Sequence, residues 1–215
     1  TMQGLSDGGI NTNDAFEMLL AIRRIGGKRL EQFYGAGNED DEAPRGRQPV
    51  VQSSLVEDLN ELAHKHMSRI DADDTARIAR ARPRVMVATS DVHEHGKLAL
   101  EQVLRTIGAE PIDGGVSVEA DVLAQDAVRA DAQAIMVSTY NGVALDYYRL
   151  LKAALVTQGS AIPVLIGGRT NQIPHGSNTS LPVDVTAELT AEGAIVCRTI
   201  EDAAPALVNI MESNK

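Results

Sequence analysis

The chain has 215 residues, of which 43% are apolar, but it holds only two Phe, four Tyr and no Trp. The core must therefore be aliphatic, which is typical of the buried strands of a parallel sheet. A net charge of −10 argues against a general nucleic-acid-binding surface, because contacts to phosphates need clustered cations.

The single cysteine and the polar amino terminus both favour a cytoplasmic protein. Cys197 has no second cysteine with which to pair, and such chains are typical of reducing compartments. Residues 1–13 are polar and rich in glycine, unlike a secretion signal. No apolar run approaches the ~20 residues that a membrane-spanning helix needs. We therefore expect neither a membrane nor nucleic acid among the partners.

Residues 1–82 are predicted to form a mainly helical region without a strand pattern. Apolar residues recur there at helical spacing, and Asn, Asp and Ser stand where helices would begin. A stretch rich in Gly, Pro and acidic residues, at 35–49, is typical of an exposed loop or linker. We interpret the region as a linker and docking segment. Its expected helices are 14–26, 54–70 and 73–81.

From residue 83 to residue 215 the pattern changes to strands that alternate with helices. Five such strands predict an α/β domain with a Rossmann-like (flavodoxin-like) parallel sheet in the order 2-1-3-4-5, flanked by helices. The expected strands are 84–89, 109–113, 133–138, 162–166 and 193–197, and the expected helices are 97–107, 119–129, 142–157 and 201–212.

The loop after the first predicted strand contains Asp91, His93 and Gly96, which form the pattern D-x-H-x-x-G. In an open parallel sheet, ligands bind beside the carboxyl ends of the strands, at the point where the strand order reverses. An imidazole there can bind a metal through one ring nitrogen while a carboxylate holds the other. We predict that His93 is a metal ligand; the alternative is a loop histidine that caps the following helix.

These motifs resemble those of the cobalamin (vitamin B12)-binding domains of mutases and methyltransferases. That family combines D-x-H-x-x-G with a serine motif, S-x-L, after the third strand and a glycine pair after the fourth. Here Ser138, Thr139 and Tyr140 stand at the serine motif, with tyrosine in place of the usual leucine. Gly167 and Gly168 match the glycine pair. The resemblance covers the predicted sheet domain but not the region before it.

The resemblance implies that His93 binds cobalt in place of the cofactor's own benzimidazole, while Asp91 accepts a hydrogen bond from the second imidazole nitrogen. It also implies that the displaced nucleotide tail lies beside the sheet, against the serine motif, and that glycines admit the cofactor closely. The cofactor-binding residues so predicted are Asp91, His93, Gly96, Ser138, Thr139, Tyr140, Gly167 and Gly168, with His93 as the metal ligand.

Neighbouring residues of similar type have simpler interpretations. His95 falls in the variable part of the motif and is expected to face solvent. Lys97 opens the next predicted helix, where it could contact an anionic group. His64 and His66 lie two residues apart on a predicted helix, so they point to different faces and are expected to be exposed. The sequence contains no P-loop, no G-x-G-x-x-G and no recognisable catalytic nucleophile.

The leading hypothesis is the cobalamin-binding subunit or domain of an adenosylcobalamin-dependent mutase, an isomerase that catalyses radical 1,2-rearrangements. In that family a separate catalytic barrel, of about 200 residues or more, binds the substrate. We therefore expect a hetero-oligomer and little activity from the chain alone. One alternative is a methyl-carrying corrinoid protein that binds methylcobalamin. Glu94 fits the acid that usually follows the histidine in that group, but His95 stands where an apolar residue usually precedes the glycine, and residues 1–82 fit its four-helix cap poorly. A non-enzymatic cobalamin sensor is a further alternative, and the simplest is a flavodoxin-like domain for another ligand.

Overall fold

The structure is a computed structural model that describes residues 61–174 and 181–213, all of which belong to the unit Asp58–Lys215. The helix expected at 14–26 and the loop expected at 35–49 lie outside these residues, as does the first part of the helix expected at 54–70. Residues 61–67 are helical. The next helix, α4, covers Ala72–Ala81, which confirms the helix predicted before the first strand.

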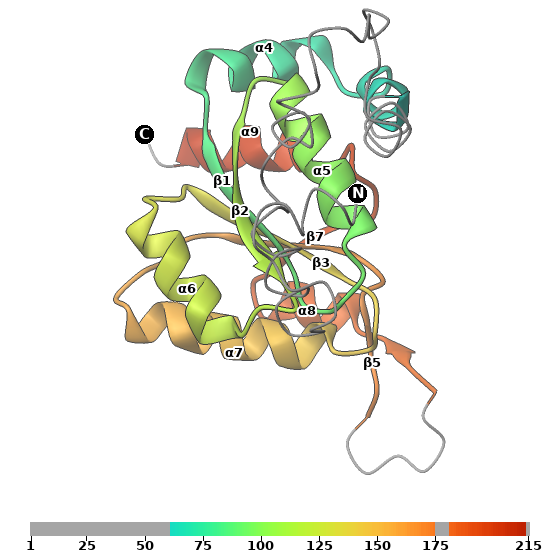
Figure 1. The fold of residues 1–215 in the computed structure, drawn as a ribbon, viewed down its shortest axis with the longest axis vertical. Coiled ribbons are helices and arrows are strands. Elements are labelled where there is room, and N and C mark those ends of the chain that lie inside the picture. Colours follow the sequence, from blue (N-terminus) through green and yellow to red (C-terminus); the bar gives the residue numbers. More distant parts are fainter. Residues whose placement is uncertain (1–60, 175–180, 214–215) are drawn as a thin grey trace, which may run out of the picture. The chain divides into compact units, whose positions relative to one another are not determined.

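The sheet has five parallel strands in the order β2-β1-β3-β4-β7, which confirms the predicted order 2-1-3-4-5. Its strands form the centre of the domain in Figure 1. Strands β1 and β3 are buried along almost their whole length, as expected for strands covered on both faces. The strands are β1 Arg84–Thr89, β2 Glu110–Val116, β3 Ala134–Thr139, β4 Val164–Gly168 and β7 Ile195–Cys197.

Helices cover both faces of the sheet (Figure 1). Successive residues of β1 point to opposite faces: Met86 and Ala88 join one hydrophobic cluster, whereas Val85 and Val87 join the other. The first cluster packs under α6 Ala120–Arg129 and α7 Ala144–Thr157, and the second under α5 His95–Thr106 and α9 Ala203–Ser213. Helix α4 packs against α9. Of the helices in the described ranges, none is long and apolar enough to cross a membrane.

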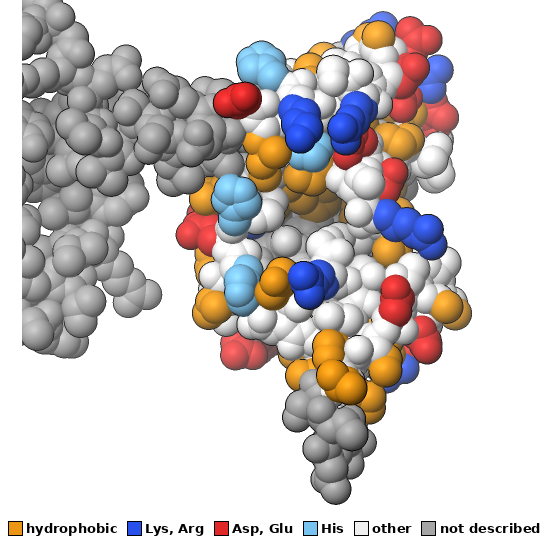
Figure 2. All heavy atoms as spheres, turned by 90° about the vertical axis from the view of Figure 1, so that its right-hand side faces the viewer, with side chains coloured by type: hydrophobic (Ala, Val, Ile, Leu, Met, Phe, Trp, Pro, Cys, Tyr) orange, Lys and Arg blue, Asp and Glu red, His pale blue; other side chains and the backbone are white. Residues whose placement is uncertain are grey.

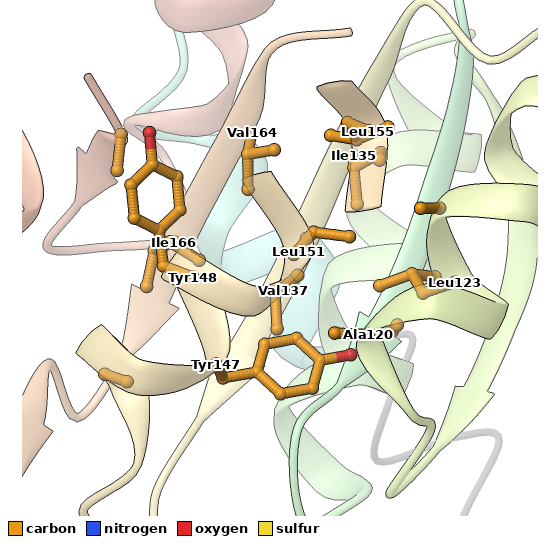
Figure 3. Packing of buried hydrophobic residues seen from close by; sticks show 14 of the residues in the cluster. Ala120, Leu123, Ile135, Val137, Tyr147, Tyr148, Leu151, Leu155, Val164 and Ile166 are labelled. Atoms are coloured by element: carbon orange, nitrogen blue, oxygen red, sulfur yellow. The ribbon is translucent and has the colours of Figure 1, made fainter. Parts of the chain in front are cut away.

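The core beneath α7 is aliphatic with two tyrosines at its border (Figure 3). Leu151 and Leu155 of α7 are buried in the same cluster as Ile135 of β3. The ring of Tyr147 lies in this layer, while its hydroxyl donates a hydrogen bond to the backbone carbonyl of Val118 at 3.0 Å. The scarcity of aromatic residues in the sequence is thus matched by a core built mainly of aliphatic side chains, alanines among them.

A short antiparallel hairpin follows β4, and the sequence did not predict it. Its strands, β5 Asn171–Gln172 and β6 Val183–Asp184, have only two residues each, too few to make an alternating pattern. The hairpin is tied to α7 because the side-chain oxygen of Gln172 accepts hydrogen bonds from the N–H groups of Leu145 and Asp146, each at 3.1 Å. The short helix α8, Thr186–Ala191, was also not predicted.

Candidate functional site at the carboxyl edge of the sheet

The carboxyl ends of β1, β3 and β4 lie side by side, and the predicted site residues follow them. In the sheet register Thr89 pairs with Ser138, and Ser138 pairs with Gly167. The loops that leave these strands therefore begin next to one another, although 49 residues separate Asp91 from Tyr140. The adjacency of the first and third loops, expected from the strand order, is present in the structure.

Asp91 joins two of these loops through its carboxylate, which is only 5% exposed. One oxygen accepts hydrogen bonds from the backbone N–H and from Nδ1 of His93, both at 2.9 Å. The other oxygen accepts from the N–H groups of Tyr140 at 2.7 Å and Asn141 at 3.2 Å. Burial alone would raise the pKa of Asp91, but the hydrogen bonds outweigh it and hold the pKa below its usual value of 3.8. Asp91 is therefore an ionised, fixed acceptor.

His93 has one ring nitrogen committed and the other available. A carboxylate can only accept hydrogen bonds, so Nδ1 of His93 is the donor in its contact with Asp91. In the neutral ring Nε2 then carries the lone pair, and the side chain is 47% exposed. Within the described ranges no hydrogen-bond partner occupies Nε2. Histidines that bind metals usually donate their second ring N–H to a carboxylate or carbonyl in this way.

The ring of Tyr140 lies against the imidazole of His93, with 4.4 Å between the ring centroids and 35° between the ring planes. The guanidinium of Arg169 lies 4.6 Å from the centroid of the same tyrosine ring. Three side chains from the loops after β1, β3 and β4 thus form one continuous stack. Tyr140 is 44% exposed, so the stack borders solvent.

A cavity of about 400 Å³ opens beside this stack, between α5, the carboxyl half of the sheet and the segment that joins β7 to α9. Its deeper wall is apolar. Figure 2 shows a hollow on this side of the molecule, with histidine and basic side chains along its border. Four predicted residues line the cavity: Gly96, Ser138, Gly167 and Gly168. The other lining residues are His66, Arg69, Leu100, Met136, Val137, Leu165, Ile166, Cys197, Arg198, Thr199, Ile200, Glu201 and Ala203.

Two of the predicted glycines have steric reasons to be glycine. A Cβ added to Gly96 would lie 2.8 Å from Oγ of Ser138, so the first turn of α5 approaches the end of β3 closely. Gly168 has φ +89°, and a Cβ there would collide with the carbonyl oxygen of Thr139. Gly167 is less constrained, since its added Cβ would lie 3.4 Å from the carbonyl oxygen of Cys197.

The structure therefore divides the predicted residues into two groups at one edge of the sheet. Asp91, His93 and Tyr140 contact one another, and the remaining group, of Ser138 and three glycines, lines the cavity. Thr139 belongs to neither group, because it is 1% exposed and its hydroxyl donates to the carbonyl of Arg169 at 2.9 Å. Its contact with a cofactor stays a prediction, as do the roles of the others.

Lys97 differs from the sequence-based expectation. Its side chain is 2% exposed, and its Nζ lies 2.7 Å from Oε1 of Glu101 and 2.8 Å from Oδ1 of Asp113. Burial would lower the pKa of Lys97, but hydrogen bonds to the two carboxylates raise it above 10.5. Lys97 is thus a structural cation that joins α5 to β2, and the suggested contact with an external anion is wrong.

Sequence reasoning also missed the border of the cavity. His66 was expected to be exposed, yet its side chain is 18% exposed and its Nδ1 lies 3.1 Å from Oε1 of Glu201. Nη1 of Arg69 lies 3.2 Å from the same oxygen. The position of Glu201 just after the last predicted strand was a signal that it lies at the functional edge. For His66 and Arg69 no local pattern gave such a signal, because they precede the sheet domain.

Comparisons with known proteins gave two results. No family model matches the chain. Among solved structures, a cobalamin-binding protein from Desulfitobacterium hafniense DCB-2 aligns with a TM-score of 0.49 and 18% identity, over 73% of this chain and 95% of that one. The methanol:cobalamin methyltransferase complex from Methanosarcina barkeri aligns with a TM-score of 0.49 and 16% identity, over 62% of this chain and 48% of that one. At such identities, we base the function on the chain's own residues.

Proposed function

We propose that the chain binds a cobalamin and that Nε2 of His93 is the lower ligand of its cobalt. The observation that carries this proposal is the hydrogen bond of 2.9 Å between Nδ1 of His93 and buried Asp91, at the carboxyl edge of a parallel sheet. This bond fixes the tautomer and strengthens electron donation from the free nitrogen. A single imidazole suits a metal that brings most of its own ligands, as cobalt does in a corrin ring.

The adjacent cavity fits the cofactor's nucleotide tail, which His93 would displace from cobalt. Its volume of about 400 Å³ lies in the usual range for small-molecule sites. An apolar wall suits a benzimidazole ring, and the hydroxyl of Ser138 supplies a polar group at the end of β3. Side chains at Gly96 and Gly168 would collide with Ser138 and Thr139, so the two glycines let the loops that border the cavity pack closely against the end of β3.

Within this role, adenosylcobalamin in a mutase is our first candidate. The bound cofactor would supply radical chemistry for a 1,2-rearrangement, on a substrate held by a catalytic partner subunit or domain. The residues of this chain would orient the cofactor: His93 ligates, Asp91 keeps the proton on Nδ1, and the loops after β1 and β3 are held together by the Asp91 carboxylate. The region of residues 1–82 would serve the docking of the partner.

A methyl-carrying corrinoid protein is the second candidate, favoured by one observation. An acidic residue, Glu94, directly follows His93, as is usual in that group. To separate the two candidates, the chain would be produced in cells that are supplied with corrinoid, purified in the dark and analysed by mass spectrometry. A bound adenosyl form supports the mutase, whereas a methyl form supports the carrier.

The decisive experiment for cobalamin binding is a visible-spectrum titration of the purified chain, with His93→Ala and His95→Ala as a matched pair. The wild type and His95→Ala should bind with a histidine-ligated, base-off spectrum. His93→Ala should lose that spectrum and bind more weakly by about tenfold or more, because a metal–ligand bond is removed. Binding that is unchanged in His93→Ala would overturn the assignment of the ligand, and no binding by the wild type would overturn the function.

A further inference from the structure

Tyr140 contacts both the candidate ligand and the carboxylate that holds it, each through a different part of the residue. Its backbone N–H donates to Asp91 at 2.7 Å, and its ring packs on the His93 imidazole with 4.4 Å between centroids. The same residue therefore helps to hold the carboxylate and covers one face of the imidazole. A hydrogen bond at Nδ1 alone leaves the half-exposed ring free to pivot about that bond, whereas a surface against the ring face opposes the pivot.

Arg169 covers Tyr140 on the side of the loop that follows β4. Its backbone is fixed to the end of β3, since its N–H donates to the Thr139 carbonyl at 2.7 Å and its own carbonyl accepts from the Thr139 hydroxyl at 2.9 Å. This anchoring delivers the guanidinium to within 4.6 Å of the centroid of the Tyr140 ring, inside the range of a cation–π contact. The guanidinium of Arg169, which is held at the end of β4, therefore restrains the ring of Tyr140 at the end of β3.

We propose that Tyr140 and Arg169 act as a clamp that fixes the orientation of the His93 imidazole, so that Arg169 is a positioning residue for the metal ligand. This inference rests on the proposed function only in naming His93 as the ligand; the clamp itself is a property of the cofactor-free chain. It also accounts for the tyrosine at the third position of the serine motif. Leucine, usual there, has no ring to receive a guanidinium.

The first test needs no cofactor. Ring protons of His93 near the face of Tyr140 experience its ring current, and their NMR signals can be assigned by their loss in His93→Ala. Arg169→Met keeps an apolar stem but removes the charge, so these signals should move toward the values of an unstacked histidine. Tyr140→Leu should complete that shift. Arg169→Lys keeps a cation and Tyr140→Phe keeps the ring, so in both variants the ring-proton signals of His93 should stay close to their wild-type positions.

The second test uses cobalamin and measures the fraction of bound cofactor with the histidine-ligated spectrum. Arg169→Met should lower the equilibrium constant between the histidine-ligated and unligated bound forms about two- to fivefold, the size expected for an exposed cation–π contact. Arg129→Met is the matched control, because Arg129 is a surface arginine on α6 that pairs with Asp126. That control should leave both the NMR signals and the spectrum unchanged.

The outcomes separate the two hypotheses. If the wild type binds no cobalamin but the NMR signals respond as described, the clamp stands and the proposed function fails. If cobalamin binds through His93 while Arg169→Met changes neither the ring-proton signals nor the ligated fraction, the proposed function stands and the clamp is refuted. An equal loss of the histidine-ligated fraction in Arg169→Met and Arg169→Lys would also refute the clamp, since a cation–π contact tolerates lysine.

Discussion

At the scale of single residues, Asp91 decides the geometry of the site. Its two oxygens accept hydrogen bonds from both sides, from His93 and from Tyr140 and Asn141. Only an ionised carboxylate can satisfy all these donors, because a protonated carboxyl or an amide would present a donor to one of them. The residue that orients the candidate ligand is therefore also the one that fixes the two loops.

Asp91→Asn should destabilise the fold by about 1–3 kcal/mol at pH 7, the cost of leaving a buried hydrogen-bonding group unsatisfied. The amide keeps the size of the side chain, but its NH₂ group must face N–H donors in either orientation. Urea denaturation measures the change. Asp126→Asn is the control, since it removes an exposed ion pair with Arg129 and should cost less than about 0.5 kcal/mol.

The pH dependence of this effect follows from the lowered pKa of Asp91. The folded pKa lies below the unfolded value of 3.8, so the stabilisation is fully present above that value and is lost as the pH falls through the folded pKa. The difference in stability between wild type and Asp91→Asn should therefore narrow below about pH 4. A difference that stays constant from neutral pH into this range would contradict the role assigned to the carboxylate.

At the scale of elements, the glycine pair at the end of β4 does two different things. The two glycines were predicted together from a family motif, yet Gly168 has φ +89° and no room for a Cβ against Thr139, whereas Gly167 has nearly ordinary contact with Cys197. A motif reports that glycine is used at both positions. Only the backbone geometry tells which of them the strand end itself requires.

Gly168→Ala should therefore destabilise the chain by more than about 2 kcal/mol, because a Cβ adds a backbone collision to a conformation that alanine disfavours. Gly167→Ala should cost less than about 1 kcal/mol, since its neighbour need move only slightly. The two variants, compared by urea denaturation, are controls for each other. A loss from Gly168→Ala as small as that expected from Gly167→Ala would show that the collision at Gly168 is relieved by movement of the strand end.

The sequence predicted the regular elements better than the irregular ones, for a physical reason. Strands such as β1 and β3 are continuous apolar runs, because they are covered on both faces. The two-residue strands β5 and β6 and the six-residue helix α8 are too short to show any period. Their positions depend on contacts distant in sequence, such as the hydrogen bonds that the side-chain oxygen of Gln172 accepts from the first turn of α7.

At the scale of the whole domain, the part of the candidate site that depends on strand order was predictable from the sequence. Asp91, His93 and Ser138 were placed together because loops at one switch point must adjoin. Residues before the sheet also form part of the cavity border, and strand order could not predict that part. His66 and Arg69 contact Glu201 there, with 3.1 Å from Nδ1 and 3.2 Å from Nη1 to Oε1 of Glu201. Contacts of this kind between charged side chains leave no periodic signal in a sequence.

Glu201 should therefore link the segment around residue 66 to the sheet in a pH-dependent manner. Its side chain is 12% exposed. Burial would raise the pKa, but hydrogen bonds, including those from His66 and Arg69, lower it from 4.5 to about 2. Its contribution to stability is complete above pH 4.5 and is lost as the pH falls toward the folded pKa. Because solvent at the cavity mouth screens these charges, we expect about 1–2 kcal/mol.

Glu201→Gln should accordingly be less stable than wild type at pH 7 but lose less stability between about pH 5 and pH 3, as measured by urea denaturation. Glu212→Gln is a close control, because Glu212 also pairs with a distant arginine, Arg77, at 3.1 Å but is 54% exposed. Its effect should be less than about 0.5 kcal/mol. If both variants lose stability with the same pH profile, burial of Glu201 is not the source of the linkage. The ion pairs of Glu201 would then add no more to the stability than an exposed surface pair.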